Sequence, residues 1–197
     1  ALLAREGDAV PPVEARDELG GRAGRWSSDG FVFDTGPSWY LMPEVFDHFF
    51  RLLGTSSAEQ LDLVRLDPAY RVYFEAEPEP FDLPGSDARD ALVSLDPTAA
   101  DRLDAYLASA AETYDLATSK FLYSTYESLR PLLGRDTLAQ LPRLARLLGE
   151  PLDRFIRRHS DDVRVQQVLG YPAVFLGTSP AAAPSMFGAV LALLAVL

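Results

Sequence analysis

The sequence predicts a mixed α/β fold, in which a partial βαβ unit is followed by a small sheet and then by a helical subdomain. Three observations predict it. The first 14 residues fit the end of a helix followed by a strand. Residues 61–95 alternate between apolar and polar side chains in short stretches broken by proline, which is typical of strands. From residue 96 onward, apolar side chains recur at helical spacing.

The N-terminal segment is interpreted as the middle of a βαβ unit. Residues 1–6 fit the last turns of its helix, which Gly7 ends. Its second strand is predicted over residues 9–14, although Pro11 and Pro12 lack the N–H that a central strand donates. On this interpretation the first strand and the glycine-rich turn of the unit lie upstream of the sequence. No basic region precedes an apolar stretch, so we expect no signal peptide.

A β-hairpin is predicted next. Its strands are expected over Arg22–Trp26 and Phe31–Asp34, and the dipeptide Asp29-Gly30 supplies the positive φ angles that a tight turn needs.

Helices are predicted where caps and apolar spacing agree. They are expected over residues 43–53, from 97 onward after the N-cap Asp96, over 137–149 with a kink or break at Pro142, over 152–159, and over 161–171 with Asp161 as N-cap. The sequence contains no internal repeat or low-complexity linker. We therefore expect two parts, residues 1–60 and residues 61–197.

Composition excludes several kinds of function. The formal net charge is −11, which disfavours a nucleic-acid partner because phosphate binding needs clustered basic surface. The absence of cysteine excludes disulfides, iron–sulfur clusters and thiol nucleophiles. Glu44 and His48 are four residues apart on a predicted helix, but no third ligand accompanies them, so no metal site is predicted. Hydrolase, zinc-protease and Walker motifs are absent from the sequence.

The C-terminal stretch, Met186–Leu197, is wholly apolar, and no charged residue follows Arg164. It is shorter than the roughly 18 apolar residues that indicate a membrane span. Two interpretations stay open: a buried core segment, or a segment that dips into a membrane.

Two short segments carry the residues suited to a cofactor. Glu14 follows the predicted strand and can accept both hydroxyls of a ribose, as acids do in dinucleotide-binding folds. Gly20 and Gly21 allow backbone to approach a pyrophosphate, and Arg22 adds a cationic fork for phosphate oxygens. The segment 33–39, with Asp34, Gly36 and Pro37, leaves a strand in a sharp turn that can lie against a ring. A solvated acid and two ordinary turns are the alternative reading of the same residues.

Residues 13–43, VEARDELGGRAGRWSSDGFVFDTGPSWYLMP, closely resemble bacterial-type phytoene desaturases, the FAD-dependent carotenoid desaturases of the flavin amine-oxidase superfamily. Residues 171–180, YPAVFLGTSP, resemble the same family further along the chain. The spacing of the acid and the Gly-Gly-Arg group marks only the superfamily, whereas the segments FDTGPSWYLMP and YPAVFLGTSP narrow the resemblance to its carotenoid branch. The glycine-rich FAD turn of the family and most of its C-terminal half are missing from the sequence.

The resemblance implies a partial Rossmann-like FAD-binding domain over residues 1–60 and the sheet and helices of a substrate domain over 61–197. It implies that Glu14 binds the FAD ribose, that Gly20, Gly21 and Arg22 lie along the pyrophosphate, and that Asp34, Gly36 and Pro37 lie near the flavin. It further implies a C40 carotenoid substrate that loses hydride to the flavin, and a cytoplasmic enzyme peripheral to the inner membrane face. No catalytic acid or base is assigned. Another flavin oxidase, acting on amines or porphyrinogens, and a non-catalytic membrane-associating fragment are the alternatives.

Overall fold

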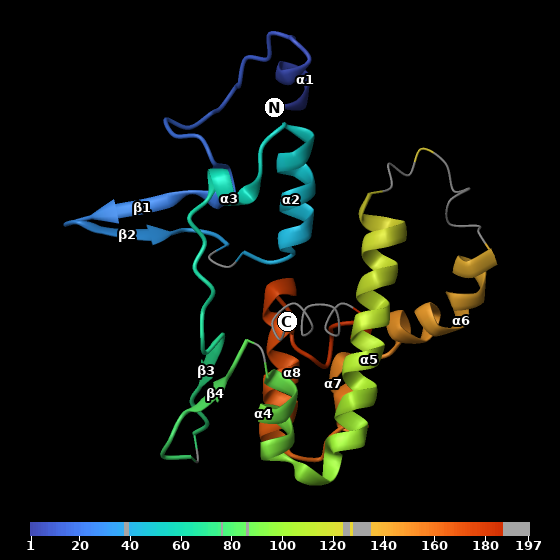
Figure 1. The fold of residues 1–197 in the computed structure, drawn as a ribbon. Helices are drawn as coiled ribbons and strands as arrows, with labels where there is room; N and C mark the ends of the chain where they lie inside the picture. The colour runs from blue at the N-terminus through green and yellow to red at the C-terminus, as the bar shows by residue number, and fades with distance from the viewer. Residues whose placement is uncertain (38–39, 76, 86, 124–126, 128–134, 187–197) are drawn as a thin grey trace. The chain divides into compact units, whose positions relative to one another are not determined.

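The structure, a computed structural model, describes residues 1–37, 40–75, 77–85, 87–123, 127 and 135–186 (Figure 1). The chain forms two compact units, Ala1–Val64 and Arg65–Leu197, and each is described by itself. This division falls close to the predicted one after residue 60. The assignment of the first part to FAD and of the second to substrate stays a prediction.

Unit 1 is built from short helices and one hairpin. Its elements are α1 (Leu2–Arg5), the 3-10 turn η1 (Gly21–Ala23), β1 (Arg25–Ser28), β2 (Phe31–Asp34), α2 (Pro43–Leu52) and α3 (Ser57–Gln60). The helix predicted from Pro43 is confirmed, with the proline at its start and Gly54 just beyond its end at φ +81°.

The predicted strand over residues 9–14 is wrong, because these residues are extended coil without a strand partner. A strand is held by ladder hydrogen bonds to a neighbour, and the described residues of unit 1 provide only β1 and β2, which pair with each other. Pro11 and Pro12 also have no N–H to donate. Apolar character without a pairing partner is therefore not enough to form the strand.

The hairpin is confirmed, with a shift in its first strand. β1 and β2 pair antiparallel, with Arg25 opposite Asp34 and Ser28 opposite Phe31. Asp29 and Gly30 have φ angles of +52° and +84°, which fit the two-residue turn that matches strand twist. The predicted start at Arg22 is wrong, since Gly21–Ala23 form a 3-10 turn and the strand begins at Arg25.

Unit 2 is mainly helical and contains one small sheet. Its elements are β3 (Tyr70–Val72), β4 (Phe81–Leu83), α4 (Ala88–Leu95), the 3-10 turn η2 (Pro97–Ala99), α5 (Ala100–Leu116), the π-helical segment η3 (Ala117–Leu122), α6 (Arg135–Gly149), α7 (Leu152–Arg157), α8 (Val163–Gly170) and the 3-10 helix η5 (Tyr171–Leu176). β3 and β4 pair antiparallel. The strand prediction for residues 61–95 is wrong over residues 88–95, because Ala88 and Leu92 are spaced by one helical turn and are both buried.

The core of unit 2 lies between α4, α5, α7 and α8, whose ribbons run alongside one another in Figure 1. Tyr106 of α5 packs on Phe155 of α7, with ring centroids 5.4 Å apart, and both side chains are buried. Other fully buried core side chains are Leu92, Leu103, Leu152, Ile156, Val165 and Leu169. The helix predicted around Pro142 is confirmed as one helix, α6, with the proline inside it.

Two predicted helix caps are corrected. Asp96 does not cap α5, because Pro97–Ala99 form a 3-10 turn before the α-helix begins at Ala100. The carboxylate of Asp96 instead accepts hydrogen bonds from Thr98 and Ser160, both at 2.6 Å. The N-cap of α8 is Asp162, which accepts from the backbone N–H of Arg164 at 2.7 Å, and not Asp161.

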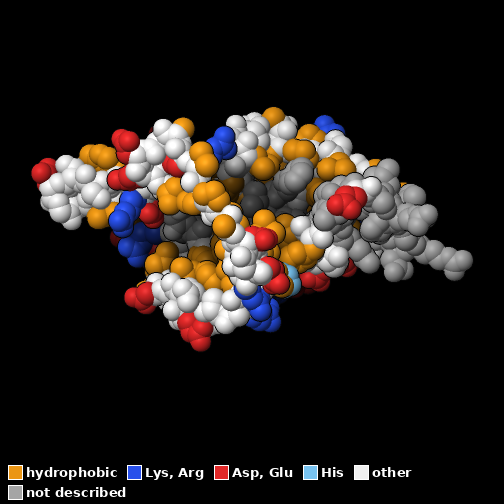
Figure 2. Space-filling model, turned by 90° about the horizontal axis from the view of Figure 1, so that it is seen from above, with side chains coloured by type: hydrophobic (Ala, Val, Ile, Leu, Met, Phe, Trp, Pro, Cys, Tyr) orange, Lys and Arg blue, Asp and Glu red, His pale blue; other side chains and the backbone are white. Residues whose placement is uncertain are grey.

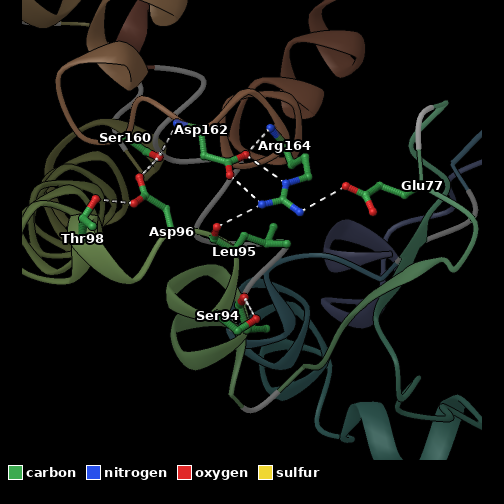
Figure 3. A network of polar contacts seen from close by, with 9 residues as sticks. Glu77, Ser94, Leu95, Asp96, Thr98, Ser160, Asp162 and Arg164 are labelled. Atoms are coloured by element: carbon green, nitrogen blue, oxygen red, sulfur yellow. Dashed lines mark hydrogen bonds and ion pairs between the residues drawn. The ribbon is translucent and has the colours of Figure 1, made fainter.

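A polar network joins these caps across unit 2 (Figure 3). The guanidinium of Arg164 donates to the carboxylate of Asp162 at 2.7 Å, to the backbone carbonyl of Leu95 at 3.1 Å and to the carboxylate of Glu77 at 3.2 Å. It therefore ties the start of α8 to the end of α4 and to the loop between β3 and β4. Hydrogen bonding to Arg164 lowers the pKa of Asp162.

Candidate cofactor site

The predicted cofactor residues on either side of the hairpin lie in two adjoining segments of unit 1. Gly20–Gly24 precedes β1, and Thr35–Pro37 follows β2. Because β1 and β2 are antiparallel and joined by a two-residue turn, their outer ends lie next to each other. The sequence separates the two segments by the length of the hairpin, and the fold brings them together.

The backbone of Gly36 lies directly on the carbonyl of Arg22. A Cβ atom placed on Gly36 would lie 1.8 Å from the Arg22 carbonyl oxygen and 2.9 Å from its carbonyl carbon. No side chain fits at such a separation, because both atoms belong to backbone and cannot rotate away. Glycine at position 36 is therefore required for these two segments to meet.

A second contact lies one residue nearer the hairpin. The backbone N–H of Thr35 donates to the carbonyl of Gly24 at 3.0 Å. A Cβ on Gly24 would lie 3.2 Å from Thr35 Oγ1 and 3.3 Å from the Gly21 carbonyl oxygen. The glycines of this loop thus permit close backbone packing as well as a tight turn.

The Gly20–Ala23 loop turns back on itself. The backbone N–H of Ala23 donates to the Gly20 carbonyl at 2.9 Å, and Gly20 and Gly21 have φ angles of +122° and +55°. The side chain of Arg22 is exposed, and within the described part of the chain its guanidinium makes no hydrogen bond or ion pair. An unpaired guanidinium beside exposed backbone is suited to a phosphate group.

Glu14, Asp34 and Pro37 are exposed. The carboxylate of Glu14 accepts from the backbone N–H groups of Ala15 and Arg16 at 2.8 and 3.0 Å, and among the described residues these are its contacts. The structure therefore does not join Glu14 to the Gly20–Ala23 loop by a hydrogen bond.

Asp34 ends β2 opposite Arg25. Ser38 and Trp39, the end of the predicted ring-facing turn, lie outside the described residues.

These residues fit the pyrophosphate part of a dinucleotide cofactor. At this contact the backbone of Gly36 packs directly on the backbone of Arg22, and the exposed side chain of Arg22 supplies positive charge. Close approach of backbone together with a cationic fork is how proteins hold a pyrophosphate. Glu14 has the chemistry for a ribose, Asp34 is the last residue of β2, and Pro37 follows Gly36.

Unit 2 contains a pocket of about 380 Å³ beside α7, α8 and η5. The residues that line it are Asp153, Ile156, Arg157, Val163, Gln166, Gln167, Gly170, Tyr171, Ala173, Val174, Thr178 and Pro180. Five of these belong to the segment 171–180 that carries the family resemblance. The lining residues of α7 and α8 were not predicted, because nothing in the sequence of these two helices distinguishes a pocket wall from an ordinary amphipathic helix face.

The described residues contain neither a metal-binding cluster nor a helix that could span a membrane. No group of three or more His, Asp or Glu side chains there is placed to hold a metal ion. Among the same residues, no helix combines the length and the apolar composition that a bilayer crossing requires. The apolar stretch 186–197 was predicted as either a core or a membrane segment, and from residue 187 it lies outside the described residues.

Figure 2 shows apolar side chains exposed between the charged ones on one face, and the exposed apolar residues include Trp26 and Phe33.

The outer ends of the hairpin thus carry two glycine-dependent loops that meet backbone to backbone. The sequence matches the family of flavin-containing amine oxidoreductases over residues 1–194, and the chain therefore belongs to that family. Its mixed helices and small antiparallel sheets are those of a partial Rossmann-like flavin-binding unit followed by a largely helical part.

Two curated relatives of the chain are desaturases by name. A carotenoid 3,4-desaturase from Haloarcula japonica is 35% identical over 187 residues, which cover 94% of this chain and 37% of that protein. A 4,4'-diapophytoene desaturase (4,4'-diaponeurosporene-forming) from Staphylococcus aureus is 27% identical over 193 residues, which cover 96% of this chain and 38% of that protein. The chain thus spans little more than a third of the length of these relatives.

Proposed function

We propose that this chain is part of a FAD-dependent desaturase that acts on phytoene or a related carotenoid. Two findings support the proposal together. The chain belongs to a flavin-dependent family and is similar, over nearly its whole length, to carotenoid desaturases. The observation that carries the assignment of the cofactor site is the contact of Gly36 with Arg22, which joins the two segments expected to hold a dinucleotide.

In this proposal each candidate cofactor residue of unit 1 has a distinct role. Arg22 binds phosphate oxygens, Gly20 and Gly21 let the backbone approach the pyrophosphate, and Glu14 accepts the ribose hydroxyls. Gly36 with Asp34 and Pro37 lies near the ring system. A bound FAD would supply the redox chemistry by taking up a hydride from one carbon of the substrate while the neighbouring carbon loses a proton, and the residues of this chain would orient the cofactor.

The proposed substrate imposes a different demand on the protein. A carotenoid hydrocarbon offers no polar group for recognition, so that burial and shape must orient it. The pocket of unit 2 has apolar walls from Ile156, Val163 and Val174 and includes the segment 171–180. We propose that this segment contributes to the surface that receives the polyene.

Product analysis tests the proposed activity. A protein that contains this chain and has the full length of the relatives is expressed in cells that make phytoene. The pigments are extracted and separated by chromatography. Desaturated polyenes with absorbance at longer wavelength are expected. Unchanged phytoene under every electron acceptor tried, with turnover of an amine or a porphyrinogen by the same protein, would favour the other flavin oxidases.

We also propose a peripheral location at the cytoplasmic face of the inner membrane, because the substrate is a membrane-soluble hydrocarbon. Flotation with liposomes tests it, using proteins with and without residues 186–197. Recovery of both in the soluble fraction, with or without substrate in the vesicles, would contradict this location and the alternative of a membrane-associating fragment.

A further inference from the structure

The register of the hairpin fixes the distance between the two cofactor segments. The strand pairs run from Ser28 opposite Phe31 to Arg25 opposite Asp34. Continued by one step, the same register places Gly24 opposite Thr35, where the structure has the 3.0 Å backbone hydrogen bond. A further step brings Gly36 to Ala23, and a Cβ on Gly36 would lie 3.6 Å from the Ala23 Cα.

The register is itself set by the turn at the far end of the hairpin. A two-residue turn with both φ angles positive allows one pairing of the strands, and a slip by one residue would reverse the face of every side chain in β2. Under such a slip a residue with a Cβ would replace Gly36 on the Arg22 carbonyl, where no side chain fits. The contact between Gly36 and Arg22 therefore depends on the backbone hydrogen bond next to it, in which Thr35 donates to the Gly24 carbonyl.

We propose that Thr35 and Gly24 are positioning residues for the cofactor: their backbone hydrogen bond holds Gly36 against Arg22 and so gives the dinucleotide surface its shape. This inference rests on the proposed binding of FAD to unit 1. Neither residue is expected to touch the cofactor, and both act through the segments that they join. The side chain of Thr35 matters less than its N–H.

Proline substitution separates the backbone bond from the side chain. Thr35→Pro removes the N–H that donates to Gly24, whereas Thr35→Val keeps the N–H and the branched shape and removes only the hydroxyl. Val32→Pro is a matched control. Ladder bonds alternate along an antiparallel strand, so that the N–H of Val32 points away from β1 when that of Thr35 points toward it.

The experiment uses the full-length FAD-loaded protein and measures FAD affinity by equilibrium dialysis and the visible circular dichroism of the bound flavin. Thr35→Pro is expected to weaken FAD binding by about tenfold, the equivalent of one lost hydrogen bond, and to change the dichroism at saturating FAD. Thr35→Val and Val32→Pro are expected to match the wild type in both. A merely structural role would lower the unfolding temperature without FAD and leave the dichroism of bound flavin unchanged.

A milder pair of variants covers the case in which Thr35→Pro does not fold. Gly24→Ala crowds Thr35 Oγ1, and Thr35→Ala in the same protein removes that atom. We expect weaker FAD binding in the single variant and partial recovery in the double variant, because the Gly21 carbonyl oxygen still lies 3.3 Å from the new Cβ.

Each outcome decides a different point. Wild-type affinity in both Thr35→Pro and Gly24→Ala would overturn the positioning role, as would an equal loss in Thr35→Val or Val32→Pro. A wild-type protein without affinity for FAD would instead overturn the proposed function.

Discussion

Gly36 illustrates how a single residue determines the candidate site. Its Cα faces backbone atoms of Arg22 with no room for a methyl group. The sequence predicted a sharp turn at Gly36. Its partner was not, because the contact depends on strand register, which apolar patterning alone does not specify.

Gly36→Ala is expected to destabilise unit 1 by about 2–4 kcal/mol, because the new methyl group forces the two segments apart. Fluorescence-monitored urea unfolding reports on this unit, since Trp26 stacks on Phe33 within the hairpin. Gly149→Ala in unit 2, followed by circular dichroism, is the control for the effect of alanine itself, because a Cβ there meets nothing within 4 Å and its φ is not positive. Equal unfolding midpoints for Gly36→Ala and wild type would contradict the contact.

The hydrogen bond from Ser160 to the Asp96 carboxylate stabilises the fold to a degree that depends on pH. Hydrogen bonds from Ser160 and then Thr98 lower the pKa of the Asp96 carboxyl. Since the pKa is lower in the folded than in the unfolded state, this stabilisation is complete above the ordinary pKa of about 3.9. It is lost as the pH falls through the folded value.

Ser160→Ala is therefore expected to cost about 1.5–3 kcal/mol at neutral pH, the value of a buried hydrogen bond to a charged group. The difference from wild type should shrink as the pH falls below about 4. Unfolding in urea, followed by circular dichroism across pH, measures both. Ser94→Ala, which removes a hydroxyl donating to the Ala91 carbonyl at an exposed site, should change little at any pH. A Ser160→Ala effect that grows on acidification would show that the sign is wrong.

At the scale of elements, turn and cap residues correctly predicted the hairpin turn and a helix start. The strand over residues 9–14, which needs a partner distant in the sequence, was predicted wrongly. The Asp29-Gly30 turn and the Pro43 helix start are local, because their φ requirements depend on a few neighbouring residues. The strand over residues 9–14 needed a pairing partner that the pattern could not supply. The proline and glycine residues before residues 88–95 predict further short strands, but the buried residues Ala88 and Leu92, one helical turn apart, favour the observed helix.

Pro142 gives an element-scale prediction. It lies inside α6, where its missing N–H leaves the carbonyl of Leu138 without the usual helical donor. Pro142→Ala is expected to stabilise unit 2 by about 1 kcal/mol or more, because an interior proline costs a helix up to about 3 kcal/mol. Pro97→Ala, at the start of η2 where no helical N–H is needed, should not stabilise it. Thermal unfolding by circular dichroism compares them. An unchanged or lower unfolding temperature in Pro142→Ala would show that the proline is required by its surroundings.

At the scale of the whole molecule, the proposed cofactor residues among these 197 positions supply only some of the groups that usually bind a dinucleotide. The sequence contains no G-x-G-x-x-G turn at a helix start, where the helix dipole and free N–H groups favour an anion. Charged hydrogen bonds from Glu14 and Arg22 contribute about 1.5–3 kcal/mol each. They must offset about 4–15 kcal/mol for immobilising the ligand.

We therefore expect the 197-residue chain alone to retain little FAD. Purification with FAD, desalting, and the ratio of flavin to protein absorbance measure the retention. A stoichiometric complex would contradict the expectation. Loss of that complex in Glu14→Ala would then identify the ribose contact as its main support.

The proposed function requires that a flavin bound to unit 1 take hydride from a carotenoid. The most direct measurement mixes the FAD-loaded full-length protein with phytoene in the absence of oxygen and follows the visible absorbance of the flavin. We expect the oxidised flavin band to disappear as an equal amount of desaturated polyene forms. A flavin that stays oxidised with phytoene and related carotenoids, but is reduced by an amine or a porphyrinogen, would contradict it.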